Sequence, residues 1–199
     1  MNLQTRVVNI LTKPASEWPV IAAEPSDVSG LYRNYIAMLA AIPAVCTFLG
    51  LMVIGVPFFG SYGFSAALVA GIMSYVSTLA SVYIAALIIE KLAPNFDSSG
   101  DTAQALKLVA YASTPVWIAG VLHLVPLLGI LTILALLYAI YLFYLGVAPV
   151  MKTPHDKVLP YMVVSAVVVV VVTVCLQFLL TTLSGAALFG GAAVGASGF

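Results

Sequence analysis

Charged side chains are scarce in this sequence. Only 7% of its 199 residues are Asp, Glu, Lys or Arg, against about 25% in soluble proteins. Hydrophobic residues make up 63%, which excludes an ordinary soluble domain and a disordered chain. The net charge is zero, so no overall basic field attracts nucleic acid, and we expect no nucleic-acid partner. The composition predicts an all-α, polytopic integral membrane protein.

Residues that bind metals or carry out catalysis are also few. The two cysteines, Cys46 and Cys175, lie inside apolar runs and predict neither a disulfide framework nor a zinc site. No acid lies in an expected span, His123 is the only histidine in one, and no phosphate-binding or dinucleotide motif occurs. We therefore expect no enzyme activity, no cofactor and no metal. Asp97 and Asp101 lie in a turn-rich loop whose oxygens could coordinate a cation, but their spacing matches no EF-hand.

The charged residues fall in three short stretches and leave three long charge-free runs. A membrane-spanning helix needs about 20 apolar residues, so the first two runs each hold two spans and the third holds one. The Gly- and Pro-containing segment 55–63 is the expected turn within the first run. The five expected spans are 34–54, 64–89, 104–124, 128–150 and 160–183.

Lysine and arginine are distributed unevenly among the connections between these spans. All seven fall in the N-terminal segment, around the loop after the second span and in the loop after the fourth. The positive-inside rule then places the N-terminus in the cytoplasm and the C-terminus on the opposite side. An even number of spans would break this pattern. The alternative, in which residues 104–124 form a surface helix, stays open.

Before the first span, the sequence predicts an amphipathic arm over residues 1–33. A helix over residues 2–13 ends at Pro14, and a second helix begins with Ser16 as its cap. We expect the arm to lie along the cytoplasmic headgroups with Trp18 as an interfacial anchor. Lys13, Trp18 and Glu24 are its candidate surface residues. The membrane domain is then 34–183, and residues 184–199 form a flexible Gly/Ala-rich tail.

The most polar part of the expected membrane domain surrounds Pro115. This proline predicts a kink in the third span, where Ser113 and Thr114 can bond to backbone groups that the kink releases. The tyrosines of the fourth span are expected to hydrogen-bond to the third. The small residues of the second span predict a packing face. The candidate ligand site in the bundle core comprises Tyr111, Ser113, Thr114, Pro115, Trp117, Tyr138, Tyr141 and Tyr144.

Several segments together resemble the Yip domain family (Ypt-interacting proteins), in its compact prokaryotic-type form. The segments are Ile10–Pro14 with Glu17-Trp18 and Glu24-Pro25, Leu92–Phe96, Tyr111–Trp117 with Gly120, and Tyr138–Gly146. The resemblance implies a five-span helical fold with a cytoplasmic N-terminus, and a bacterial inner membrane as its location. Eukaryotic members associate with Rab-type GTPases. Their Asp-Leu-Tyr-Gly-Pro signature is absent, with Gly30–Asn34 at most a remnant, so the trafficking function does not carry over.

These observations favour a membrane-organising protein that binds membrane lipids, a membrane-protein partner or a second copy of itself, without catalytic activity. The alternative is a transporter or channel for a small solute or ion, with a polar path around the Pro115 kink. Against transport stand the lack of a membrane-embedded charge and the odd number of spans, which does not divide into equal inverted halves.

Overall fold

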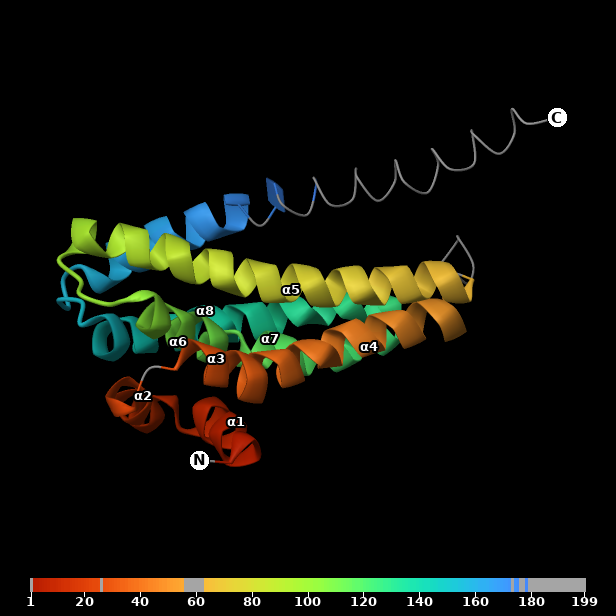
Figure 1. The fold of residues 1–199 in the computed structure, drawn as a ribbon, viewed down its shortest axis with the longest axis horizontal. Helices are drawn as coiled ribbons and strands as arrows, with labels where there is room; N and C mark the ends of the chain where they lie inside the picture. Colours follow the sequence, from red (N-terminus) through yellow and green to blue (C-terminus); the bar gives the residue numbers. More distant parts are fainter. Residues whose placement is uncertain (1, 26, 56–62, 173, 176–177, 179–199) are drawn as a thin grey trace.

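The computed structural model describes residues 2–25, 27–55, 63–172, 174–175 and 178. Within these residues the regular structure is entirely helical, with no strand. Long helices run side by side in an elongated bundle, and two short helices, α1 (Leu3–Thr12) and α2 (Pro14–Ala23), lie against it (Figure 1). Most of the turn expected at 55–63 and the whole tail expected at 184–199 lie outside the described residues.

Three helices of the described chain are long and apolar enough to cross a membrane: Val28–Val53, Phe64–Phe96 and Leu127–Met151. The first joins α3 (Val28–Leu31), a π-helical turn η1 (Tyr32–Ile36) and α4 (Ala37–Val53). The second is α5 (Phe64–Leu92) followed by the 3-10 turn η2 (Ala93–Phe96), and the third combines η4 (Pro126–Leu131) with α8 (Thr132–Met151). The first span begins at Val28, ahead of the expected start at residue 34.

The third expected span is broken into two helices. α6 (Thr102–Ala112) and α7 (Thr114–Ala119), which continues into η3 (Gly120–Leu124), meet at an angle of 41°. Pro115 lies in the first turn of α7, where its missing N–H costs no helical bond. Thr114 Oγ1 lies 3.4 Å from the carbonyl oxygen of Ala110, to which it donates. The predicted kink and the predicted hydroxyl beside it are thus confirmed.

The predicted number of five spans is not confirmed. Counting the bent pair as one span gives four within the described residues. At the fifth predicted position, 160–183, an apolar helix runs from Val158 to Val172, and much of the remainder lies outside the described residues.

Close contacts between backbones join the first span to its neighbours. A Cβ atom on Gly50 would lie 2.2 Å from the backbone oxygen of His123 in η3. On α5, a Cβ atom on Gly71 would lie 3.0 Å from the Cβ of Phe48 in α4, and Ser77 and Ala85 are also buried. Small residues allow such close approach between membrane helices. The packing interpretation of the second span is therefore confirmed.

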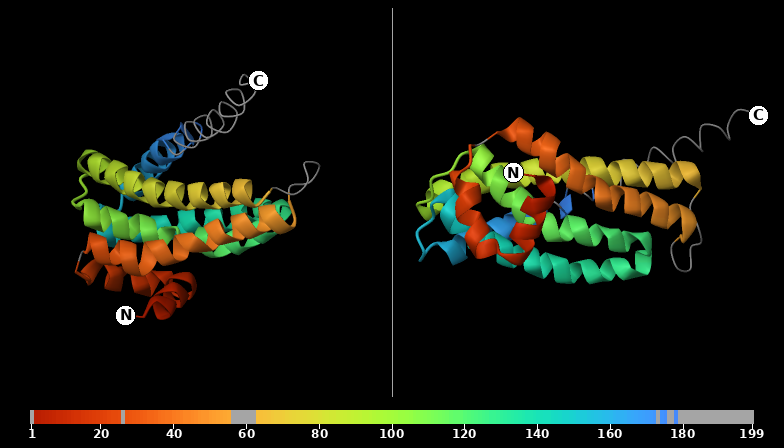
Figure 2. Two further views of the ribbon diagram at one scale, coloured as in Figure 1. Left: turned by 45° about the vertical axis from the view of Figure 1, so that its right-hand side comes forward. Right: turned by 90° about the horizontal axis from the view of Figure 1, so that it is seen from below.

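The charged loops lie together at one end of the bundle (Figure 1). The backbone N–H of Ser99 donates to the carbonyl of Met151 at 2.9 Å, and the hydroxyls of Ser98 and Thr153 are 2.8 Å apart. Lys157 forms an ion pair with Asp97. The arm covers the half of the bundle that contains this end (Figure 2). The structure thus places the three charged stretches of the sequence on one side of the apolar helices.

Asp97 and Asp101, the two candidate cation ligands, both have partners within the protein. Asp97 adopts a left-handed backbone conformation with φ of 51° and pairs with Lys157. Asp101 is the N-cap of α6, where Oδ1 accepts from the backbone N–H of Gln104 at 2.8 Å. Among the described residues, no group of three His, Cys, Asp or Glu side chains could hold a metal ion.

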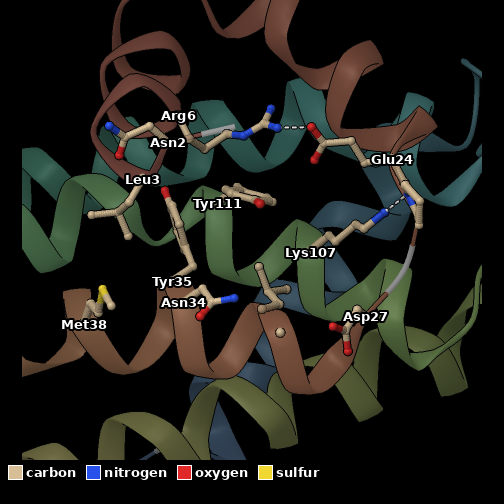
Figure 3. A pocket seen from close by; sticks show the side chains of 13 residues that line it. Asn2, Leu3, Arg6, Glu24, Asp27, Asn34, Tyr35, Met38, Lys107 and Tyr111 are labelled. Atoms are coloured by element: carbon tan, nitrogen blue, oxygen red, sulfur yellow. Dashed lines mark hydrogen bonds and ion pairs between the residues drawn. The ribbon is translucent and has the colours of Figure 1, made fainter.

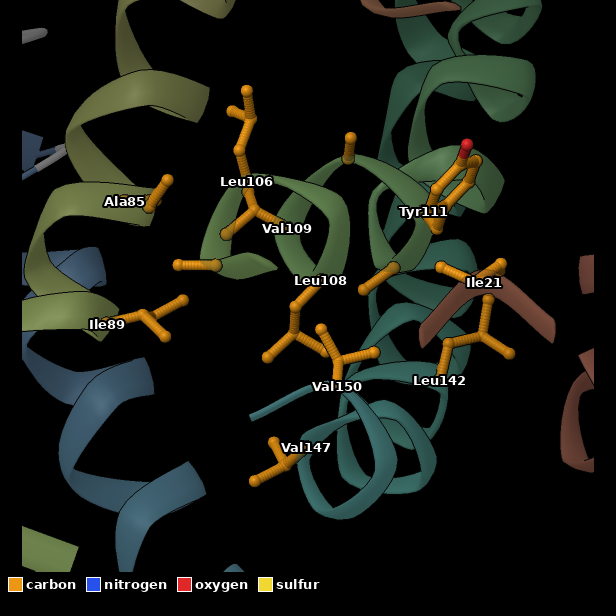
Figure 4. Close-up of a cluster of buried hydrophobic side chains, with 14 of the residues drawn as sticks. Ile21, Ala85, Ile89, Leu106, Leu108, Val109, Tyr111, Leu142, Val147 and Val150 are labelled. Carbon is orange, nitrogen blue, oxygen red and sulfur yellow. The ribbon is translucent and has the colours of Figure 1, made fainter. Parts of the chain in front are cut away.

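The main buried cluster is built around α6. Residues 105–112 of this helix are all buried, and Figure 4 shows its side chains facing three neighbours. Val109 faces α5, where Ala85 and Ile89 are buried, and Leu108 faces α8. On the arm, Ile21 belongs to the same cluster. The arm is therefore packed into the core through α2.

Candidate functional site

A buried arginine holds the two helices of the arm together. Arg6 in α1 is only 4% exposed, and its Nη1 donates to Glu17 in α2 at 2.6 Å. Its Nη2 pairs with Glu24, just after α2. Glu17 also accepts from the side-chain amide of Asn9 at 3.1 Å, and the guanidinium lies 5.6 Å from the ring centre of Tyr111 in α6. A charge is stable at such depth only when it is paired and hydrogen-bonded.

A lysine from α6 binds the end of α2. The Nζ of Lys107 donates to the carbonyl of Ile21 at 3.3 Å and to that of Glu24 at 2.5 Å. Carbonyls at a helix C-terminus lack intrahelical partners and carry partial negative charge, so a lysine there is favourable. No carboxylate of the described residues lies within ion-pair distance of Lys107. Backbone carbonyls are therefore its direct partners, and the carboxylates of Glu24 and Asp101 lie farther away.

A pocket of about 690 Å³ opens between the arm and the membrane helices. Its wall contains two cationic side chains, Arg6 and Lys107, and two anionic ones, Glu24 and Asp27. Figure 3 shows Glu24, Lys107 and Asp27 at one side of this pocket. The four charges of the wall sum to zero.

The opposite side of the pocket has two apolar side chains, with the side-chain amide of Asn2 beside them (Figure 3). Leu3 and Met38 line it there, away from Asp27 and Lys107 (Figure 3). Met38 is 56% exposed and lies well inside the apolar helix Val28–Val53. The pocket thus changes from ionic to apolar along one face of that helix, and Asn34 lies between the two ends (Figure 3).

The π-helical turn η1 shapes this face. Insertions of this kind in α-helices often occur at functional sites. In η1 the side chain of Asn34 faces the pocket, while Tyr35 is buried and its hydroxyl lies 2.7 Å from that of Thr114. The rings of Tyr35 and Tyr111 meet edge to face with centroids 4.6 Å apart. The pocket wall is therefore fixed to the kink in the third span.

Asp27 lies at the entrance of the pocket, just before the first span. Its carboxylate accepts from the hydroxyl of Ser29 at 3.0 Å. The backbone N–H of Gly30 and then this hydroxyl hold the pKa of Asp27 below its usual range. Within the described residues, Asp27 has no cation within ion-pair distance. It is therefore an ionised carboxylate that forms no ion pair, with the charge of Arg33 farther away.

The predicted polar centre forms only in part. Tyr111, Thr114, Pro115 and Trp117 are all buried near the kink, and Tyr111 also lines the pocket. Ser113 is half-buried and lines a different, apolar cavity between α5, α6 and α8.

The prediction for the tyrosines of the fourth span is wrong. Tyr138 donates to the carbonyl of Leu11 in α1 at 2.7 Å, so its partner is the arm. Tyr141 and Tyr144 are 48% and 43% exposed on the outside of α8. Residues three apart advance slowly around a helix, and here the drift carries two of the three rings away from the core.

Of the three arm residues predicted at the surface, only Lys13 is exposed. Trp18 is 1% exposed and packs on α8, where a Cβ atom on Gly146 would lie 2.7 Å from its ring. It is therefore a core residue and not an interfacial anchor. Glu24 is part-buried in its pair with Arg6. Ser16 does not cap α2, because the helix begins at Pro14 and the Ser16 hydroxyl donates to the Lys13 carbonyl at 3.0 Å.

Sequence reasoning missed most of the pocket. In the sequence, Arg6 is one of the polar residues of the expected helix 2–13, and Lys107 lies at the edge of the expected span 104–124. Both signals were visible, because Lys107 is a charge at the edge of the expected span 104–124 and Arg6 can be matched by acids of the same arm, Glu17 and Glu24. Nothing in the sequence marks Asn34 and Tyr35 as pocket residues, because a π-helical turn has no recognisable pattern in a single sequence.

Comparisons with known proteins are consistent with this architecture. The model of the Yip1 domain family matches residues 8–177, which include Glu24, Asp27 and Lys107 but not Arg6. Two curated relatives are the inner membrane protein YohC of Escherichia coli strain K12 and that of E. coli O6:H1 strain CFT073. Each is 27% identical over 127 residues, which cover 62% of this chain and 65% of the relative. The chain thus spans somewhat less than two thirds of these relatives, and no solved structure matches it.

Proposed function

The chain belongs to the Yip1 domain family, and from that premise we propose that it is a non-catalytic membrane protein that binds a membrane lipid in the pocket beneath its N-terminal arm. The observation that carries the proposal is the change from ionic to apolar lining along the pocket. A phospholipid has the same order of groups, with a charged headgroup joined to apolar chains. A small polar solute would leave the apolar side of the pocket uncovered.

The position of the pocket supports a lipid as the ligand. It lies at the end of the bundle where the charged loops gather, beside the start of the apolar helix Val28–Val53. We propose that this is the level at which lipid headgroups meet the hydrocarbon core. A lipid could therefore enter the pocket from the bilayer past Met38 while its headgroup stays at the same level in the membrane.

We further propose that the protein resides in a bacterial inner membrane with its N-terminus in the cytoplasm and its C-terminus on the opposite side. The relatives named as inner membrane proteins support the membrane, and the positive-inside rule supports the orientation. The pocket would then open at the cytoplasmic leaflet.

The absence of catalysis is part of the proposal. In the pocket, Arg6 and Glu24 are paired with each other, and Lys107 binds backbone carbonyls. These contacts hold the arm on the bundle. A general acid or base would have to give up such a contact in order to transfer a proton.

Transport through the Pro115 kink has less support. Thr114 is fully buried, and its hydroxyl is shared between Tyr35 and the Ala110 carbonyl. Tyr141 and Tyr144, which would have extended a polar path, are on the outside of the bundle. A polar route across the membrane therefore has no set of lining groups at this position.

The proposed function is tested by filling the pocket. Asn34 is exposed and faces it, so Asn34→Trp should displace lipid without disturbing the buried ion pairs. The control is Val53→Trp, at a position of the same long helix that is 70% exposed. Native mass spectrometry of protein purified in mild detergent measures the lipid retained per chain.

We expect less retained lipid in Asn34→Trp than in the wild type, and unchanged retention in Val53→Trp. Met38→Trp fills the apolar side of the same pocket and serves as a second variant if Asn34→Trp lowers the thermal midpoint. Equal lipid retention in the wild type and in both pocket variants would contradict the proposal.

A further inference from the structure

The pocket contains one cation and one anion that form no ion pair, although opposite charges lie farther away from each. Arg6 is matched by Glu17 and Glu24. Lys107 and Asp27 remain, and among the described residues neither lies within ion-pair distance of an opposite charge. Both line the pocket, and Figure 3 shows them at the same side of it.

Lys107 is placed to bind an anionic group. An ammonium has three N–H donors, and two of them are directed at the carbonyls of Ile21 and Glu24. The side chain is held rigidly in this position, because the residue is only 5% exposed. A third donor is left for a ligand, and a charge-assisted bond to a phosphate oxygen is among the stronger hydrogen bonds.

Asp27 is placed to bind a cationic group. One carboxylate oxygen accepts from Ser29, and the carboxylate keeps capacity for further donors. Its pKa is held low by the Gly30 N–H and the Ser29 hydroxyl, so it keeps its negative charge at neutral pH. The second carboxylate of the pocket, Glu24, adds to the negative potential on the same side.

We propose that the pocket selects a zwitterionic phospholipid with a primary amine, with the headgroup phosphate at Lys107 and the ammonium at Asp27. This assignment rests on the proposed lipid-binding function and names the class of lipid. A purely anionic headgroup would satisfy Lys107 but leave Asp27 facing like charge. A quaternary ammonium headgroup would match the charges but has no N–H to donate to the carboxylate.

The wall supports this selectivity in two further ways. Its four charges sum to zero, so it favours a ligand without net charge over an anionic one. On the far side, Leu3 and Met38 provide apolar surface for the start of the acyl chains. The same headgroup chemistry occurs in free phosphoethanolamine, which lacks any group for that surface.

The experiment compares three lipids with matched acyl chains: phosphatidylethanolamine, phosphatidylcholine and phosphatidylglycerol. The full chain in detergent is incubated with equal amounts of all three, and native mass spectrometry measures the fraction bound to each. We expect phosphatidylethanolamine to be bound roughly tenfold better than either competitor, as one charge-assisted hydrogen bond would give.

Two substitutions test the roles of the unpaired charges. Asp27→Asn should remove most of the preference for phosphatidylethanolamine over phosphatidylcholine, and the control Asp156→Asn, at an exposed residue outside the pocket, should keep it. Lys107→Met should lower binding of all three lipids. If that variant fails to fold, Lys107→Arg keeps the charge and should retain binding.

The outcomes separate this inference from the proposed function. If Asn34→Trp lowers total lipid but the wild type binds the three lipids equally, lipid binding stands and the headgroup assignment is overturned. An unchanged preference in Asp27→Asn overturns it as well. If free phosphoethanolamine raises the thermal midpoint as much as the lipid does, the ligand is a soluble amine phosphate, which overturns the lipid assignment.

Discussion

The two ends of the bundle are held together by different interactions. At the charged end, polar bonds join segments far apart in the sequence, such as Lys107 to the end of α2 and Tyr161 to the carbonyl of Ile89 at 2.6 Å. At the other end, Gly50 and Gly120 bring α4 against η3, and a Cβ atom on Gly120 would lie 2.6 Å from Pro43. Thr47 and His123 make a polar contact there, at 3.5 Å.

This difference follows from the two solvents of a membrane protein. In the hydrocarbon core, apolar side chains gain little by leaving lipid for protein, so helices associate through close backbone packing. At the water-facing end, charges can be placed at low cost if they are paired. Specific recognition by charge is therefore possible at the charged end, and the candidate pocket lies there.

The largest expected effect comes from Arg6→Met. This substitution leaves Glu17 buried without its partner, and such a change typically costs about 3–5 kcal/mol. Glu17 is only 6% exposed, so water cannot replace the arginine. Thermal unfolding in detergent would show a large fall in midpoint, and Arg6→Lys should be intermediate because a lysine cannot bridge two carboxylates in the same fork geometry.

Lys13→Met provides the matched control for Arg6→Met. Lys13 is a cation of the same arm but is exposed, and surface substitutions of this kind usually stay within about 0.5 kcal/mol. Equal midpoints for Arg6→Met and the wild type would show that the ion cluster does not hold the arm.

Gly50→Val tests the packing of the apolar end. Its Cβ would meet the backbone oxygen of His123 at 2.2 Å and that of Leu124 at 2.8 Å, and backbone cannot move aside as a side chain can. Overpacking of this kind typically costs about 1–3 kcal/mol. Gly63→Val is the control, because nothing lies within 4 Å of a Cβ atom there. A thermal midpoint of Gly50→Val equal to that of the wild type would show that α4 and η3 can move apart without loss of stability.

Tyr35→Phe tests the contact between the pocket wall and the kink. It removes the hydroxyl bonded to Thr114, and a buried hydrogen bond contributes about 0.5–1.5 kcal/mol. Tyr144→Phe, on the exposed side of α8, should have no measurable effect. Denaturant unfolding in detergent would detect the difference, and identical stabilities of the two variants would argue against this hydrogen bond.

The sequence predicted the all-helical class, the kink at Pro115 and the packing face of α5, because each depends on local chemistry. Charge-free runs of sufficient length identify apolar helices wherever they pack. A proline disrupts the helix around itself, and small residues on one face allow close approach. None of these inferences requires knowledge of which segments meet.

The sequence did not predict the pocket, because the pocket depends on where the arm packs. An amphipathic arm can lie on lipid or on protein, and both surfaces accept the same apolar face. In the structure Trp18 and Ile21 pack against the bundle, so Arg6 is buried and Tyr138 bonds to Leu11. The exposed positions of Tyr141 and Tyr144 follow from the rotation of α8, which the spacing of three residues leaves undetermined.

The smallest expected effect is that of Lys157→Met, and its salt dependence makes it informative. The ion pair of Lys157 with Asp97 lies at the same end as the Arg6 cluster, but the two side chains are 36% and 65% exposed. Exposed pairs contribute about 0.2–1 kcal/mol, and salt screens them. The small difference in thermal midpoint between Lys157→Met and the wild type should therefore disappear at high ionic strength, while that of Arg6→Met should persist. If both differences vanished with salt, water would have access to the Arg6 cluster, and the arm would be a surface element that leaves the bundle in solution.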